Sequence, residues 1–110
     1  MSIKILDCTL RDGGYVNNWE FNNDEIINII DSLTESGVEK IECGFISHTK
    51  GKLLDSSLYK NIDVINNLLK STKNSLNTPS YVCLINYGEC DINDFPVCSK
   101  SSKVVTDIRL

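Results

Sequence analysis

Strand-like apolar runs alternate with helical stripes along this chain of 110 residues, and the alternation restricts the possible folds more than any other feature. Runs rich in β-branched and aliphatic residues predict four strands, at 3–9, 38–46, 80–86 and 104–110. Apolar residues at helical spacing predict helices in the connections at 22–37 and 58–69. The third connection allows a single helical turn at 91–95. Strands separated by such crossovers pair in parallel with right-handed connections, so the order predicts an α/β fold.

A charged turn follows the first predicted strand, where residues 7–15 read Asp-Cys-Thr-Leu-Arg-Asp-Gly-Gly-Tyr. Binding sites of α/β proteins lie at the carboxyl ends of the strands, because the loops converge there. Charged side chains buried at this position need ion pairs, a metal or a ligand to offset their desolvation. A solvated turn with a capping aspartate and a flexible diglycine is an equally good interpretation of the spacing alone.

Composition excludes several classes of protein. Apolar residues make up 41% of the chain and charged residues 24%, as in ordinary soluble domains. The net charge of −4 argues against nucleic acid as a partner, since duplex binding rests on lysine and arginine. No apolar stretch approaches the roughly twenty residues that cross a bilayer, and no secretory signal is present at the N-terminus. We therefore expect a cytoplasmic protein without a membrane or nucleic-acid partner.

The five cysteines are an odd number and show no metal-type spacing. Cys8, Cys43 and Cys83 lie in strand-like runs, where cysteine behaves as a small apolar residue. We expect reduced thiols throughout, including Cys90 and Cys98, and a disulfide framework is the weaker interpretation.

Two motifs resemble those of a known superfamily. Residues 7–13 are similar to its D-x-T-L-R-D-G signature, and residues 41–45 are similar to its I-E-x-G-F ending of the second strand. The superfamily is that of the DRE-TIM metallolyases, related to HMG-CoA lyase and containing the pyruvate carboxyltransferase domain. Weaker similarity over residues 87–96, and at Ile108 and Arg109, favours the 4-hydroxy-2-oxovalerate aldolase-like branch.

The resemblance implies a TIM (β/α)8 barrel, of which this chain would supply the N-terminal half, about strands one to four. Such a barrel typically takes about 250 residues. Residues 1–110 are accordingly expected to form a partial domain, truncated after the fourth strand.

The resemblance also implies roles for three residues. Arg11 matches the arginine that holds the carbonyl or enolate oxygen of the substrate, and Glu42 matches an acidic residue that orients this arginine. Asp12 matches a carboxylate ligand of a divalent cation, Mn²⁺ or Mg²⁺. Each role has a structural alternative: Arg11 and Glu42 could form a plain ion pair between neighbouring strands, and Asp12 could cap the next element.

The chain departs from the superfamily in two respects. The superfamily takes further metal ligands from an H-x-H pair on strand seven, and the aldolase-like branch carries histidines after the signature. The chain has neither, because its single histidine is His48 and the loop at 15–21 has none. Tyr15 and His48 could take part in catalysis, although a packed aromatic and an exposed histidine are the more ordinary interpretations. Whether the chain is itself an enzyme is therefore left open, and metal binding by it alone is expected to be weak or absent.

Three functions follow from these observations. The first is the N-terminal portion of a metal-dependent carbon–carbon lyase or aldolase for a 2-oxo acid or an acyl thioester, inactive as an isolated half-barrel. The second is a non-catalytic half-barrel that forms a homodimer, or pairs with a missing C-terminal half, through the open edge strand at 104–110. The third, a nucleotide-binding flavodoxin-like domain, is weakened by the lack of a glycine-rich phosphate loop.

Overall fold

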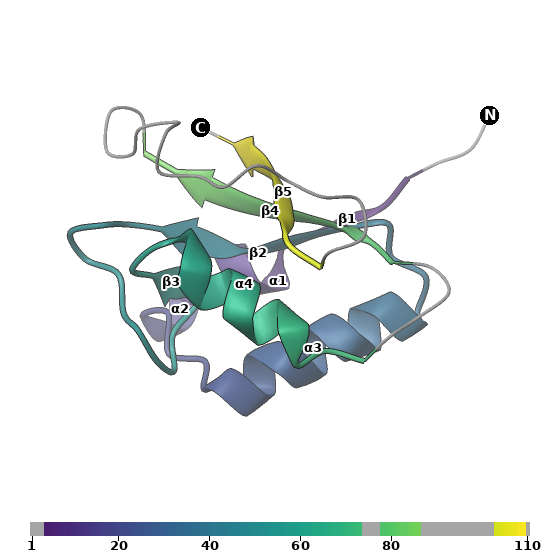
Figure 1. Ribbon diagram of the computed structural model, residues 1–110, viewed down its shortest axis with the longest axis horizontal. Helices are drawn as coiled ribbons and strands as arrows, with labels where there is room; N and C mark the ends of the chain where they lie inside the picture. The colour runs from purple at the N-terminus through teal and green to yellow at the C-terminus, as the bar shows by residue number, and fades with distance from the viewer. Residues whose placement is uncertain (1–3, 74–77, 87–102, 110) are drawn as a thin grey trace.

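The computed structural model describes residues 4–73, 78–86 and 103–109. Its elements follow in the order β1 (Leu6–Asp7), α1 (Thr9–Asp12), α2 (Gly14–Asn17), α3 (Asn23–Glu35), β2 (Lys40–Ile46), β3 (Leu58–Tyr59), α4 (Ile62–Lys70), β4 (Ser80–Ile85) and β5 (Val105–Arg109). The strands are ordered β1-β2-β4-β5, with β3 paired to β2, and every pairing is parallel. Helices α3 and α4 lie together on one side of this sheet (Figure 1). The predicted parallel α/β fold is confirmed, and it is consistent with half of a TIM barrel.

Helix α3 forms where the sequence predicts it, because both of its ends carry local signals. The Asn22 side chain accepts a hydrogen bond from the backbone N–H of Glu25 at 2.8 Å, and the Glu25 side chain accepts one from the N–H of Asn22 at 3.1 Å. Gly37 follows the helix with a φ of 83°, a conformation that favours glycine. Ile26 and Ile30 lie one turn apart and are buried, so the helix packs through its apolar stripe.

The core lies between the helices and one face of the sheet. Alternate residues of β2 and β4 pack into one buried cluster with the apolar faces of α3 and α4, and these strand residues are Ile41, Cys43, Tyr81 and Cys83. Side chains of a strand point alternately to opposite faces of the sheet. Glu42, between Ile41 and Cys43, therefore points to the face away from the helices.

The structure corrects three predicted boundaries. Within residues 4–9, the first strand is limited to Leu6–Asp7. The charged turn predicted at 7–15 contains the short helix α1, and α2 extends from this turn into the loop predicted at 15–21. Leu58–Tyr59 pairs with β2 instead of starting a helix, and α4 begins after Asn61, whose side chain accepts from the N–H of Val64 at 3.2 Å. The crossover and helical turn predicted within 87–102 lie outside the described residues.

The described cysteines agree with the prediction of reduced thiols. Cys8, Cys43 and Cys83 are free; Cys43 and Cys83 are buried, whereas Cys8 is partly exposed beyond the end of β1. Cys90 and Cys98 lie outside the described residues. Within the part of the chain that the structure describes, no helix has the length and apolar character needed to span a bilayer.

Candidate functional site

A helical turn at the carboxyl end of β1 positions the charged residues of the first motif. The Asp7 carboxylate accepts hydrogen bonds from the backbone N–H of Thr9 at 2.9 Å and from its hydroxyl at 3.1 Å. The carbonyl of Cys8 then accepts from the N–H groups of Arg11 at 3.1 Å and Asp12 at 2.7 Å. These bonds close the turn tightly and present both charged side chains at the end of the strand.

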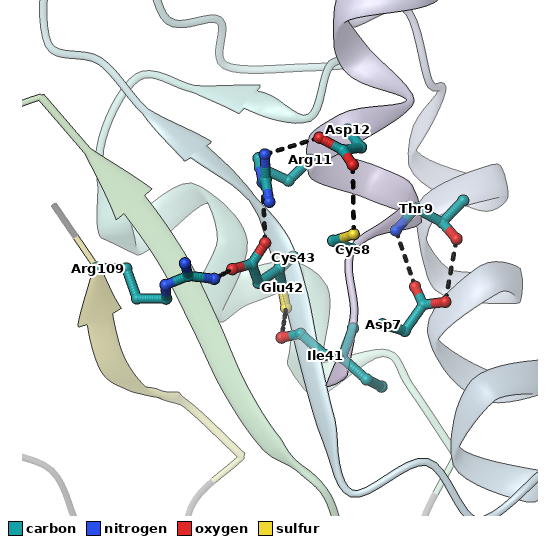
Figure 2. A network of polar contacts seen from close by, with 9 residues as sticks. All are labelled: Asp7, Cys8, Thr9, Arg11, Asp12, Ile41, Glu42, Cys43 and Arg109. Atoms are coloured by element: carbon teal, nitrogen blue, oxygen red, sulfur yellow. Dashed lines mark hydrogen bonds and ion pairs between the residues drawn. The ribbon is translucent and has the colours of Figure 1, made fainter. Parts of the chain in front are cut away.

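Arg11 pairs with Glu42, as the sequence predicts. The Arg11 Nε donates to Glu42 Oε2 at 2.9 Å, and the side chains are 20% and 0% exposed. The other carboxylate oxygen, Oε1, accepts from Nη1 of Arg109 on β5. Figure 2 shows the Arg11 guanidinium above this carboxylate and the Arg109 guanidinium to its left. One buried carboxylate therefore holds two permanent cations.

The pairing limits what Glu42 can do chemically. Each of its oxygens accepts from a guanidinium group and the side chain has no exposed surface, so a ligand in solvent reaches the guanidinium groups and not the carboxylate. A charge with no exposed surface needs this compensation, since an unpaired buried carboxylate carries a large desolvation penalty. Glu42 is thus placed to orient the two arginines.

A β-bulge brings Glu42 to this position. The register between β2 and β4 shifts between Glu42 and Gly44, so Cys43 is an extra residue opposite the neighbouring strand. Gly44 has a φ of 147°, and a Cβ there would lie 2.2 Å from the carbonyl oxygen of Ser57. The same oxygen accepts from the N–H of Phe45 at 3.0 Å, which joins β2 to the start of β3. Glycine is therefore required beside the candidate site.

Asp12 lies on the outer side of Arg11. Its Oδ1 accepts from Arg11 Nη1 at 2.7 Å, and its Oδ2 accepts from the Cys8 thiol at 3.5 Å. The side chain of Asp12 is 62% exposed. Partial burial, followed by the hydrogen bond to Asp12 and the negative charge of that residue, raises the pKa of the Cys8 thiol, and the charge of Arg11 opposes this rise.

The residues present do not fit a complete metal centre on their own. Among residues 4–73, 78–86 and 103–109, no three histidine, cysteine, aspartate or glutamate side chains are grouped closely enough to hold a metal ion. Asp12 offers one carboxylate, and one of its oxygens already contacts Arg11. A single such ligand is a poor set for a divalent cation, which binds several oxygens.

Tyr15 and His48 take separate positions. Tyr15 is 63% exposed and makes an edge contact with Trp19, with ring centroids 4.8 Å apart, so it is not packed into the core. His48 lines a hollow together with Lys60 and the N-terminal end of α4, and its backbone carbonyl accepts from the Lys60 ammonium. The described lining of that hollow does not include Arg11, Asp12 or Glu42.

Arg109 is the member of the site that sequence reasoning missed. In the sequence, Arg109 is part of a weak similarity to the aldolase-like branch that assigns it no role. A usable signal was present, because a charged residue stands near the carboxyl end of an apolar run predicted to be a parallel strand. The contact with Glu42 joins residues 67 positions apart.

Comparison with models of known protein families gives a match over most of the chain. A family model described as HMGL-like matches residues 2–85. The matched segment includes Arg11, Asp12 and Glu42, whereas Arg109 lies beyond it. No curated protein and no solved structure matches the chain.

Proposed function

The chain belongs to the HMGL-like family, whose members are generally dependent on a divalent metal, and from this premise we propose that it supplies the N-terminal part of a carbon–carbon lyase. The proposed reaction breaks or forms a bond next to the carbonyl of a 2-oxo acid, as in the 4-hydroxy-2-oxovalerate aldolase-like branch. The observation that carries the proposal is the Arg11–Glu42 pair at the carboxyl end of the parallel strands.

Arg11 has the chemistry that this reaction needs. A guanidinium group carries five N–H donors, and the contacts with Glu42 and Asp12 use one on Nε and one on Nη1. Donors are therefore left for a ligand oxygen. When the bond next to the carbonyl breaks, negative charge develops on that oxygen as an enolate, and a fixed cation stabilises this charge. Glu42 acts as a positioning residue that keeps the guanidinium of Arg11 in place.

Asp12 is the proposed ligand of a divalent cation, Mg²⁺ or Mn²⁺. A carboxylate oxygen suits either ion, and the exposed side chain is accessible to it. The other ligands would have to come from outside the described residues, so we assign no step of the reaction to the metal.

Calorimetric titration of the purified chain with pyruvate, and with oxalate as a planar analogue of its enolate, tests the proposal. We expect both ligands to bind the wild type, and we expect Arg11→Gln to weaken both. Lys73→Gln removes an exposed cation from another part of the surface and is the matched control. Equal affinity in Arg11→Gln, or no binding by the wild type, would contradict the proposal. Tighter binding of acetyl-CoA than of pyruvate would favour an acyl thioester substrate.

A second candidate function is assembly without catalysis. The order β1-β2-β4-β5 leaves β5 at an edge, paired only with β4 among the described strands. An open edge presents backbone donors and acceptors to another strand, and a homodimer would satisfy them. Light scattering across a concentration series distinguishes the two functions. A metal-independent dimer that does not bind pyruvate supports assembly, and a monomer at all concentrations contradicts it.

A further inference from the structure

Arg109 reaches the candidate site from β5, whereas Arg11 reaches it from the turn after β1. On β5 it is in register with Leu84 of β4, which is in turn paired with Phe45 of β2. Its guanidinium extends across β4 to Oε1 of Glu42, as Figure 2 shows. The described segment from Val105 to Arg109 thus contributes a charged group to a cluster that otherwise comes from the first two strands.

The three charged side chains differ in exposure. Glu42 is fully buried, Arg11 is 20% exposed and Arg109 is 52% exposed. Among the described residues, the contact of Nη1 with Glu42 is the one hydrogen bond of the Arg109 side chain, so donors on Nε and Nη2 are left for a ligand. Arg109 therefore presents hydrogen-bond donors to solvent above a buried carboxylate.

The charges of the cluster point to an anionic ligand. Arg11 has a second carboxylate partner, Asp12, at 2.7 Å. Arg109 shares its one described carboxylate partner, Glu42, with Arg11. The two arginines and two carboxylates are neutral in total, but the second carboxylate, Asp12, contacts Arg11 and not Arg109. The half-exposed guanidinium of Arg109 is therefore the positive end of the cluster, where a ligand carboxylate would be held by charge-assisted hydrogen bonds.

We propose that Arg109 binds the carboxylate of the 2-oxo acid while Arg11 binds its carbonyl oxygen, an inference that rests on the proposed function. A 2-oxo acid carries these two groups on adjacent carbons. Each oxygen of Glu42 holds one guanidinium group, so both groups lie around one carboxylate and within reach of one small ligand. Arg109 is thereby the residue that selects 2-oxo acids over neutral ketones.

Titration with pyruvate and with pyruvamide, whose carboxylate is replaced by a neutral amide, tests this role. The wild type should prefer pyruvate. Arg109→Gln should weaken pyruvate binding by about tenfold or more, and should bring the two affinities together. Arg11→Gln should weaken both ligands in similar proportion. Lys40→Gln is the matched control, because Lys40 pairs with Asp107 of β5 at 3.6 Å but has no described contact with Glu42.

Each outcome decides between the two proposals. Loss of the preference for pyruvate in Arg109→Gln alone would support the role of Arg109. An unchanged preference in that variant would overturn it and leave the proposed function standing. Failure of the wild type to bind either ligand would overturn both. If circular dichroism shows that Arg109→Gln does not fold, Arg109→Lys replaces it in the titration. Lysine keeps the charge but lacks the forked donors of arginine, so we expect weaker pyruvate binding. Unchanged pyruvate affinity in Arg109→Lys would overturn the inference.

Discussion

The Nε of Arg11 donates to Oε2 of Glu42 across 2.9 Å, although the two residues are 31 positions apart in the chain. The contact joins the turn after β1 to the interior of β2. Because Glu42 has no exposed surface, the contact is a buried ion pair, and loss of one member leaves the charge of the other uncompensated. The stability of the fold and the placement of Arg11 therefore depend on the same carboxylate.

Replacement of Glu42 should destabilise the protein. We expect Glu42→Gln to lower the free energy of unfolding by about 3 kcal/mol, because both guanidinium groups lose their shared partner. Urea denaturation followed by circular dichroism measures the change. Asp12→Asn is the control, since an ion pair on a 62% exposed side chain contributes about 1 kcal/mol or less. Equal stability of the two variants would show that the buried pair contributes little.

Metal binding by the isolated chain should be weak. A single carboxylate provides one of the several oxygen ligands that Mn²⁺ needs, so we expect a dissociation constant of about 1 mM or weaker. Mn²⁺ titration of the wild type and Asp12→Ala, followed by paramagnetic broadening of NMR signals, measures it. Broadening around Arg11 and Cys8 should disappear in the variant. Micromolar binding lost in Asp12→Ala would instead show that the chain assembles a complete site.

Elements with local signals at both ends could be predicted from the sequence. Helix α3 begins at the Asn22 cap and ends before Gly37, as expected, and β2 and β4 follow their apolar runs. Leu58–Tyr59 could not be predicted, because its apolar residues continue the stripe of α4. Tertiary contacts decide its conformation: the Tyr59 hydroxyl donates to the carbonyl of Cys43 at 2.8 Å within the core.

The candidate site was predictable only in part. Arg11 stands in a motif just after the first predicted strand and Glu42 in a motif on the second, and parallel pairing of these neighbouring strands brings them together. Arg109 depends on more than this, because the register between β2 and β4 shifts between Glu42 and Gly44, and Arg109 is paired through Leu84 with Phe45, beyond that shift. A shift of one residue moves a side chain to the other face of the sheet, so its position could not be inferred without the structure.

Gly44 should tolerate substitution less well than Gly37. Both have a positive φ, but a Cβ at Gly44 would lie 2.2 Å from the Ser57 carbonyl oxygen, whereas nothing lies within 4 Å of one at Gly37. We expect Gly44→Ala to cost about 3 kcal/mol and Gly37→Ala about 1 kcal/mol. Thermal and urea unfolding of the two variants measure the difference. If the costs were equal, backbone strain alone, and not the close contact at the bulge, would explain the requirement for glycine.

Tyr59 should make the fold sensitive to alkaline pH. Burial raises the pKa of this phenol well above its ordinary value of 10.0, and the nearby Cys43 and Cys83 add to the rise. The unfolded chain loses the proton near pH 10, whereas the folded chain retains it. The stabilisation is therefore complete below pH 10 and is lost as the pH rises toward the folded value.

Tyr59→Phe should accordingly show a shallower loss of stability above pH 10, although loss of the hydrogen bond to Cys43 should lower stability at neutral pH by about 1 kcal/mol. Urea midpoints measured from pH 7 to 11 test this. Tyr15→Phe, at an exposed position, should retain the wild-type slope. A wild-type slope in Tyr59→Phe would assign the alkaline sensitivity to another group.

Asp12 should control the reactivity of the Cys8 thiol. After burial, the hydrogen bond to Asp12 and its charge are the main causes that raise the Cys8 pKa, so Asp12→Asn should lower it. The rate of alkylation by iodoacetamide then rises at a lower pH, because the thiolate is the reacting form. Peptide-resolved mass spectrometry across pH 7 to 10 measures Cys8 separately from the other thiols. Asp24→Asn, in the first turn of α3, is the control and should leave the profile unchanged. An unaltered profile in Asp12→Asn would contradict this role, because it would mean that the Asp12 carboxylate does not act on the pKa of the Cys8 thiol.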